Sequence, residues 1–341
     1  MECSVPNEAL FTPPLREAWV RACCAVAEGA CVLTPPHVNA AAAALGDAQQ
    51  RVTTLGGRVG YPRSLGSVAA GAIALFLGRP FEGVETSAFR VSGAFGTVYM
   101  AICLDGATLL CSVCGREIQV RRLPDGALLS TVPAVTFGGI WRYLRGICVA
   151  PDGAVFVADK ANNCVLALDC NLTLCGLIGA GELRRPVYVS AGSDMVAVCC
   201  EDNADRDVYL IVALFGRADG ALLRRLTTQL RCPAGTAFLR GGCELAVVGC
   251  IRHRVSIYRT SDGVLRRHVG EGLLRLPVAV TCSIHDEIVV ADEGNCRIAV
   301  FTASGEAWKV FGYGRPWWEF AIFGNTVYAY DVNTRQCVAF R

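Results

Sequence analysis

Three aspartates whose carboxylates are suited to binding a metal or activating water recur at one position of a repeated sequence pattern. Asp159, Asp292 and Asp331 each follow an apolar run, as in Val-Phe-Val-Ala-Asp and Ile-Val-Val-Ala-Asp. Carboxylates that converge on one point could hold a divalent cation and activate water for hydrolysis. Aspartates that recur once per repeat are instead typical of turns, because their side chains accept hydrogen bonds from nearby backbone N–H groups. We expect all three to cap turns, and we assign no catalytic residue.

Metal-binding motifs are equally weak in this sequence. Cys111 and Cys114 have the spacing of a zinc-ligand pair, but no second Cys-x-x-Cys occurs and the chain has 4 histidines. A structural zinc site requires four ligands. The acidic turn at 201–207 lacks the glycine and the terminal glutamate of a calcium loop. The sequence therefore predicts neither a metal nor another cofactor.

The elements that would position these residues are repeated β-strands. A phrase made of an apolar residue, a glycine, a spacer and a proline recurs at 55–62, 178–186, 269–277 and 311–316, with a looser copy at 137–143. Each phrase precedes a short apolar strand, a turn and a second strand. Asp-Gly pairs at 125–126, 219–220 and 262–263 then predict tight turns between antiparallel strands.

The length of the repeat predicts the fold. Prolines at positions 186, 233, 277 and 316 give spacings of 47, 44 and 39 residues, with four strands in each repeat. This period is typical of the blades of a β-propeller. The apolar period of two residues excludes helical repeats. The predicted fold class is all-β, a β-propeller of four-stranded blades.

At these positions the chain resembles the NHL-repeat family. The resemblance covers residues 51–341 and is best at 143–182 and 275–314, where Val-Ala-Asp is followed by an Asn-containing turn and later by an apolar-Gly pair. It implies the propeller architecture but no particular activity. Family members include parts of ubiquitin ligases, RNA-binding propellers and lactonase-like hydrolases. The RING zinc module that accompanies NHL propellers in such ligases has no counterpart in this sequence.

Closure of the ring leaves two blade counts open. The last repeat, 316–341, has three strands, so an N-terminal strand must supply its fourth. If residues 51–56 do so, residues 62–98 form a further blade and the ring has seven. If residues 89–96 do so, the ring has six. We favour seven, because the glycine–proline phrase directly follows residues 51–56.

Residues 1–50 differ from the rest of the chain. Pro13-Pro14 precede an amphipathic stretch at 15–27, and Pro35-Pro36 precede a second one at 38–45 that ends at Gly46. Proline is favoured at the start of a helix and glycine after its end. We expect a helical N-terminal extension over 1–50 that caps the propeller, with a partner-docking arm as the alternative, and we assign the propeller to 51–341.

Composition limits the compartment and the partners. The 341 residues are 53% hydrophobic and 18% charged, which is too apolar for disorder, and the net charge of +2 does not indicate a polyanion-binding chain. The 19 cysteines are odd in number, no signal peptide precedes them, and the longest apolar run has 10 residues. We therefore expect a reduced, cytoplasmic protein without a membrane segment.

One positional bias in charge indicates a binding face. In a propeller, the segments that link one blade to the next all emerge on the same face. In this sequence they carry nine arginines and two acidic residues, accompanied by aromatic residues. The candidate binding residues are Arg58, Trp141, Arg142, Tyr143, Arg184, Arg185, Arg275, Arg315, Trp317 and Trp318.

Arginine with aromatic residues is typical of protein interfaces and of single-strand nucleic-acid platforms. We predict a non-enzymatic interaction scaffold that docks an acidic or phosphorylated protein segment, and the resemblance adds a substrate-recognition role in a ubiquitin-ligase-type assembly. RNA binding through the same face is the alternative, and a metal-dependent, lactonase-like propeller hydrolase is the second. The opposing interpretation, in which the tryptophans wedge between blades and the arginines only solubilise the face, stays open.

Overall fold

The computed structural model describes residues 83–91, 97–138, 142–201, 209–231, 235–283, 285–324 and 326–341, and all structural statements concern these residues. The chain divides into two compact units, Met1–Gly78 and Arg79–Arg341, and the described residues belong to the second. The predicted N-terminal extension at 1–50 and the predicted strand at 51–56 lie outside them.

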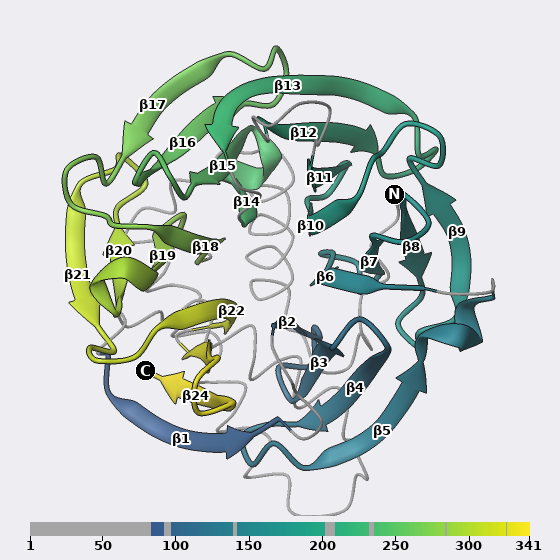
Figure 1. The fold of residues 1–341 in the computed structure, drawn as a ribbon, viewed down its shortest axis with the longest axis horizontal. Coiled ribbons are helices and arrows are strands. Elements are labelled where there is room, and N and C mark those ends of the chain that lie inside the picture. Colours follow the sequence, from purple (N-terminus) through teal and green to yellow (C-terminus); the bar gives the residue numbers. More distant parts are fainter. Residues whose placement is uncertain are drawn as a thin grey trace, which may run out of the picture. The chain divides into compact units, whose positions relative to one another are not determined.

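The described residues form six antiparallel sheets of four strands each. Figure 1 shows them arranged as blades around a central axis, with consecutive blades following one another along the chain. The prediction of an all-β propeller is therefore confirmed. Within the described part, no helix is long and apolar enough to cross a membrane.

The strands are grouped as follows. Blade 1 contains β2 (Val98–Ile102), β3 (Thr108–Val113), β4 (Glu117–Arg122) and β5 (Leu128–Pro133), and blade 2 contains β6 (Leu144–Val149), β7 (Val155–Asp159), β8 (Cys164–Leu168) and β9 (Leu174–Ile178). Blade 3 contains β10 (Pro186–Ala191), β11 (Met195–Glu201), β12 (Tyr209–Gly216) and β13 (Leu222–Arg231).

Blade 4 contains β14 (Thr236–Leu239), β15 (Glu244–Gly249), β16 (Arg254–Arg259) and β17 (Leu265–Val269). Blade 5 contains β18 (Pro277–Cys282), β19 (Ile288–Asp292), β20 (Arg297–Phe301) and β21 (Ala307–Phe311). Blade 6 contains β22 (Trp317–Phe323), β23 (Thr326–Asp331), β24 (Gln336–Phe340) and β1 (Glu85–Arg90), and short 3-10 turns lie at Ala134–Phe137, Arg240–Gly242 and Glu293–Asn295.

The ring is closed by β1, which pairs antiparallel with β24 as the outer strand of blade 6. The inner strand of that blade, β22, contacts the inner strands of both neighbours, β18 and β2, so no further blade separates blade 6 from blade 1. The ring therefore has six blades, and our preference for seven was wrong. The place beside β24 that we assigned to residues 51–56 is taken by residues 85–90.

The hydrophobic core lies between the blades, because the second strand of each blade buries both of its faces. Trp317 at the start of β22 is 1% exposed and packs edge-on against Phe340, with ring centroids 5.3 Å apart. Its indole Nε1 donates to the carbonyl of Gly312 at 2.6 Å, so the linker before blade 6 is fastened to the core. Burial of such a large ring stabilises the contact between blades by several kcal/mol, about 3–5 by the cost of its truncation.

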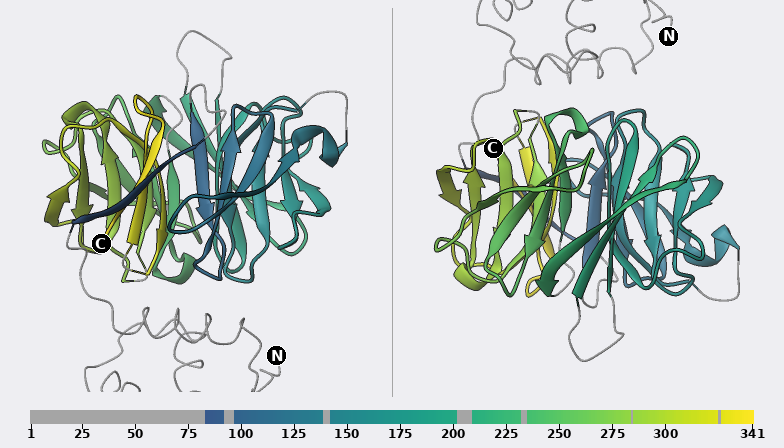
Figure 2. Two further views of the ribbon diagram at one scale, coloured as in Figure 1. Left: turned by 90° about the horizontal axis from the view of Figure 1, so that it is seen from below. Right: turned by 90° about the horizontal axis from the view of Figure 1, so that it is seen from above.

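Because the strands of each blade alternate in direction, two kinds of connection share one face of the disc, as the side views of Figure 2 allow the reader to follow. These are the linkers between blades and the turns between the second and third strands of each blade. We call this face the linker face, and its counterpart the opposite face. The linker between blades 6 and 1 lies between β1 and β2, within 91–97, rather than at the predicted 56–63.

Candidate functional site

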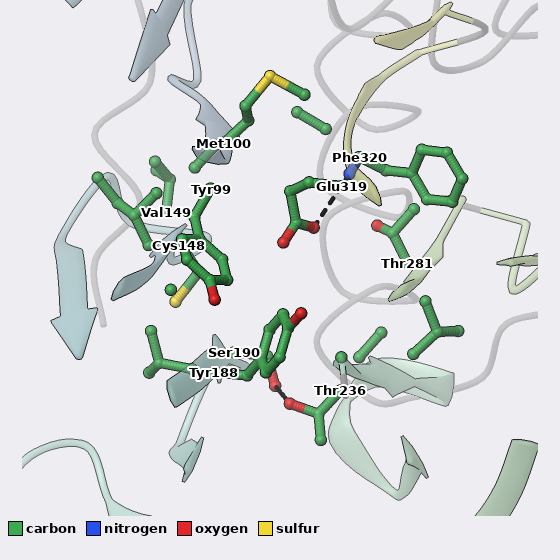
Figure 3. A pocket seen from close by; sticks show the side chains of 18 of the residues that line it. Tyr99, Met100, Cys148, Val149, Tyr188, Ser190, Thr236, Thr281, Glu319 and Phe320 are labelled. Atoms are coloured by element: carbon green, nitrogen blue, oxygen red, sulfur yellow. Dashed lines mark hydrogen bonds between the residues drawn. The ribbon is translucent and has the colours of Figure 1, made fainter. Parts of the chain in front are cut away.

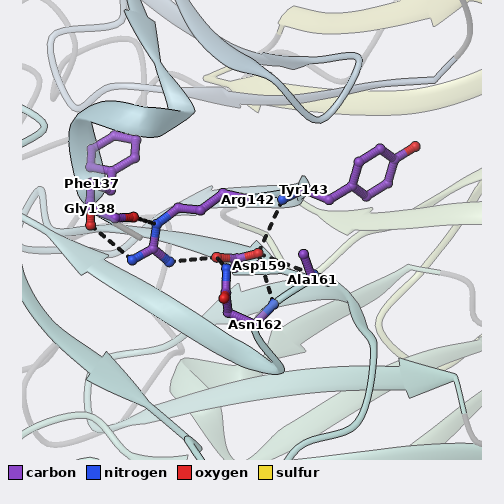
Figure 4. A network of polar contacts seen from close by, with 7 residues as sticks. All are labelled: Phe137, Gly138, Arg142, Tyr143, Asp159, Ala161 and Asn162. Carbon is purple, nitrogen blue, oxygen red and sulfur yellow. Dashed lines mark hydrogen bonds and ion pairs between the residues drawn. The ribbon is translucent and has the colours of Figure 1, made fainter. Parts of the chain in front are cut away.

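The aspartates that recur at the ends of second strands cap turns on the linker face. Asp159 is fully buried, and its Oδ1 accepts the backbone N–H groups of Tyr143 and Ala161, each at 3.2 Å. Its Oδ2 accepts the Asn162 side-chain amide at 2.8 Å and binds the guanidinium of Arg142 (Figure 4). The expected capping role is confirmed for this residue.

Asp292 and Asp331 repeat this arrangement. Oδ1 of Asp292 accepts the backbone N–H of Arg275 at 2.7 Å, and its Oδ2 accepts the Asn295 amide at 2.8 Å. Asp331 accepts the N–H of Asn333 at 2.9 Å. These carboxylates hold the turns and do not converge on the axis, which removes the ligand set that we considered for a metal-dependent hydrolase. Among the described residues, no group of three histidine, cysteine or carboxylate side chains is placed to hold a metal.

Arg142, predicted as an exposed binding residue, is committed to the fold. Its side chain is 9% exposed and forms an ion pair with Asp159. The same guanidinium donates to the carbonyls of Gly138 and Phe137, the latter at 2.9 Å (Figure 4). A guanidinium whose donors are satisfied by three acceptors fixes the linker between blades 1 and 2 and has no free donor pair for a partner.

The predicted aromatic residues are also packed rather than presented. Trp317 lies in the core, and Trp318 is half-buried between two clusters of blade contacts. Tyr143 is half-buried, and the guanidinium carbon of Arg145 lies 5.7 Å from its ring centre. Arg315 is half-buried above the ring of Trp317 at 5.7 Å. The wedging interpretation therefore fits the two tryptophans better than exposure does. Arg58 and Trp141 lie outside the described residues.

Three predicted arginines remain exposed on the linker face. Arg184 and Arg275 have no acidic partner among the described residues, and Arg185 pairs with Glu201 at 2.9 Å while 47% of its side chain stays exposed. The two acidic residues of the linkers are engaged elsewhere. Glu182 binds Arg225, and Glu271 binds Arg254 at 2.8 Å, so neither neutralises the linker arginines.

The linker sequences alone do not reveal the candidate binding residues on the turns between second and third strands, which lie on the same face. The turn between β15 and β16 also lies on the linker face and carries exposed Ile251 and Arg252. Exposed Leu273, Leu276 and Tyr313 add apolar surface from the next two linkers. We define the blade 4–6 patch as Ile251, Arg252, Leu273, Arg275, Leu276 and Tyr313.

Backbone contacts join the segments of the blade 4–6 patch. Nδ1 of His253 accepts the N–H of Leu276 at 3.0 Å. The carbonyl of Arg275 accepts the N–H of Gly294 at 2.9 Å, and the carbonyl of Cys296 accepts the N–H of Gly314 at the same distance. The patch is therefore carried by one continuous set of bonded turns and linkers across three blades.

A separate cavity of about 280 Å³ lies on the propeller axis, lined by all six inner strands. Glu319 of β22 faces it together with the aromatic side chains of Tyr99 and Tyr188 (Figure 3). Burial raises the pKa of Glu319 to about 8, even though its carboxylate accepts the N–H of Phe320 at 3.0 Å. No sequence signal marks this residue, which occurs in an ordinary strand-like run.

Comparison with known proteins identifies one repeat. A family model described as the NHL repeat matches residues 142–168, which cover β6, β7 and β8 of blade 2. This stretch includes the Asp159 cap and, apart from residue 142, lies within 143–182, one of the two segments where the sequence pattern is strongest. No curated protein matches the chain significantly.

Proposed function

Because the repeat match and the six-bladed ring together fit an NHL-repeat propeller, we propose that the chain is a non-enzymatic interaction scaffold that docks an acidic protein segment on its linker face. An NHL-repeat propeller is consistent with a role as a protein-interaction scaffold. The finer proposal concerns the surface, which is the blade 4–6 patch, and the partner chemistry, which is acidic or phosphorylated. Recognition of a substrate within a ubiquitin-ligase-type assembly is one setting for such docking.

The observation that carries the proposal is the uncompensated charge of the blade 4–6 patch. Arg252 and Arg275 are exposed, and no described acidic residue pairs with either. The nearest acidic residue of that linker, Glu271, is bound by Arg254. Two guanidinium groups that keep their donors free present a site for carboxylate or phosphate, which they bind in a bidentate manner.

Exposed apolar side chains beside these arginines support a protein partner. Tyr313 is 65% exposed, and Ile251 and Leu273 are each about half exposed. Arginine, tyrosine and large aliphatic residues in one patch have the composition of the centre of a protein interface. Charge complementarity then selects an acidic segment with apolar residues. RNA, our alternative partner, would use the arginines but gains little from leucine and isoleucine.

The proposal is tested by quantitative affinity capture from native lysate, compared between variants. The double variant Arg252→Ala/Arg275→Ala is set against the control Arg122→Ala/Arg240→Ala, whose arginines are 59% and 51% exposed on the opposite face. We expect a protein set that the control retains and that the patch variant loses by at least tenfold. Equal capture by both variants would refute the docking surface.

An RNase-treated half of each sample separates the two partner classes. A set that survives the treatment supports the protein partner. Loss of the set on treatment, together with affinity for single-stranded RNA that falls steeply with salt, would replace the proposal by RNA binding.

A further inference from the structure

The axial cavity carries an inference that is independent of the linker face. It is lined by the inner strands of all six blades, and most of its lining residues have small or apolar side chains. A few polar groups converge in it, which is typical of a small-molecule site. Among the residues that line it, Glu319 is the one with a formal charge.

The position of Glu319 results from an irregularity in blade 6. The register between β22 and β23 shifts between Trp317 and Glu319, and this shift lets both Trp317 and Phe320 enter the core. Glu319 then faces the axis. One carboxylate oxygen, Oε1, accepts the N–H of Phe320, while the other has no hydrogen bond among the described residues.

Two tyrosines form the wall near this carboxylate (Figure 3). The rings of Tyr99 and Tyr188 meet edge to face, with centroids 5.2 Å apart. Burial raises the pKa of both phenols, so both hydroxyl groups stay protonated at neutral pH. The pair offers ring surface and two hydroxyl oxygens, but it offers no positive charge to balance Glu319.

The guanidinium of Arg145, which lies beside Tyr99, is already engaged with aromatic rings. The guanidinium carbon of Arg145 lies 5.2 Å from the ring centre of Tyr99 and 5.7 Å from that of Tyr143. No ion pair joins Arg145 or any other described cation to Glu319, and the lining of the cavity contains no arginine or lysine. The carboxyl group therefore faces the cavity without a counter-ion from the described residues.

We propose that the axial cavity binds an alkylammonium group, with Glu319 as its counter-ion and the rings of Tyr99 and Tyr188 beside its charged end. An ammonium group is a compact donor that needs one free carboxylate oxygen, which is what Oε2 provides. Aromatic faces near a cation add attraction.

Two other cations fit the cavity less well. A guanidinium binds a carboxylate through two parallel hydrogen bonds, and Oε1 is already occupied by the Phe320 N–H. A divalent metal requires several oxygen ligands, often carboxylates, and the cavity supplies one. The remaining polar side chains are hydroxyls and two thiols, and the hydroxyls of Ser190 and Thr236 bind each other at 3.0 Å.

The raised pKa of Glu319 predicts how binding of an ammonium group depends on pH. With a pKa of about 8, the group is mostly protonated at neutral pH in the empty cavity. Binding of an ammonium group requires the carboxylate, so a proton is released on binding. The groups facing Glu319 are Tyr99 on β2, Tyr188 on β10, and Cys148 and Cys282 on β6 and β18, and burial raises the pKa of each of them.

The experiment measures binding of butylammonium by calorimetry, with 1-butanol as the neutral isostere. We expect butylammonium at pH 8.5 to bind at least tenfold more tightly than 1-butanol. Its affinity should fall about tenfold for each pH unit below 8, because less carboxylate is available. Alkylammonium groups stay protonated in this range, as lysine does. Affinity that does not change with pH, or equal binding of the alcohol, would overturn the proposal.

Variants and a second probe locate the site and its natural source. Glu319→Gln should abolish the preference for butylammonium, while Glu306→Gln, an exposed glutamate of the hairpin after β20, should leave it unchanged. Retained preference in Glu319→Gln overturns the proposal. A capped lysine is the second probe: if it binds within threefold of butylammonium, the source includes protein side chains, and if it binds tenfold more weakly, the source is a free amine. An affinity between these values would mean that both free amines and lysine side chains can occupy the ammonium site.

Discussion

His253 accepts the backbone N–H of Leu276 at its Nδ1, 3.0 Å away, and so binds the turn of blade 4 to the following linker. In blade 2, Asn163 does the same for Arg185 through its Oδ1, at 2.7 Å. Both turn residues have a positive φ, 54° for Asn163 and 56° for His253. The histidine thus occupies in blade 4 the turn position that asparagine holds in blade 2.

This relationship predicts the effects of two substitutions. His253→Ala should lower the free energy of unfolding by about 1 kcal/mol, because the N–H of Leu276 loses its acceptor. His253→Asn should match or exceed the wild type, because asparagine tolerates a positive φ better and retains an acceptor. Urea denaturation measures both. An unchanged free energy of unfolding in His253→Ala would show that the bond contributes nothing.

The burial of Arg142 predicts a cost that exposed arginines do not share. Removing one partner of a buried ion pair leaves the other charge uncompensated, at a cost of about 3–5 kcal/mol. Arg142→Ala should therefore lower the melting temperature by several degrees. The matched variant Arg275→Ala removes an exposed side chain and should change stability by less than about 0.5 kcal/mol. Thermal melts of both variants check this, and similar melting temperatures would contradict the burial of Arg142.

Much of the fold could be predicted because the residues that form the turns and end the strands recur in successive blades. Each Asp-Gly pair gives a tight turn, as at Gly126, where φ is +68°. Each Val-Ala-Asp ends a buried strand with a cap, as Asp159 shows. These signals are local, and they recur with the blade, so blade size and strand order follow from the sequence.

Ring closure and the site were harder, because their causes are not local. The closing strand β1 is an outer strand with one buried residue, Phe89, so it lacks the apolar alternation of an inner strand. The fate of Arg142 depends on an aspartate 17 positions away. Glu319 faces the cavity only because the register shifts after Trp317. The residue types alone do not distinguish a buried arginine such as Arg142, or a cavity-facing glutamate such as Glu319, from exposed residues of the same type.

The raised pKa of Glu319 predicts how stability changes with pH. In the folded state this group holds its proton up to a pH of about 8, against an ordinary value of 4.5. Between these values the folded state binds more protons than the unfolded state, so the stability from this group falls as pH rises. It is fully present below about 4.5 and lost above about 8, and the full difference is about 3–5 kcal/mol.

Glu319→Gln isolates this effect, since other groups titrate in the same range. The difference in unfolding free energy between the variant and the wild type should grow between pH 5 and pH 9, with the variant gaining about 3 kcal/mol by pH 9. Urea denaturation at several pH values measures it. A difference that stays constant over this range would mean that Glu319 keeps an ordinary pKa.

The closure of the ring by β1 can be tested through Phe89 and Gly126. Phe89 is 8% exposed, and a methyl group on Gly126 in blade 1 would lie 2.1 Å from its ring. Phe89→Ala should cost about 3–5 kcal/mol, because it leaves a cavity where blade 6 meets blade 1. Gly126→Ala should cost about 1–3 kcal/mol through the clash and its positive φ.

The double variant distinguishes contact from two separate defects. If the ring of Phe89 covers Gly126, then Gly126→Ala should cost less in the Phe89→Ala background, by about 1 kcal/mol or more, because the clash is gone. Only the strain of a positive φ would remain. Denaturant titration of the four proteins gives this coupling energy. Strict additivity would place residues 85–90 away from blade 1 and reopen the question of which segment closes the ring.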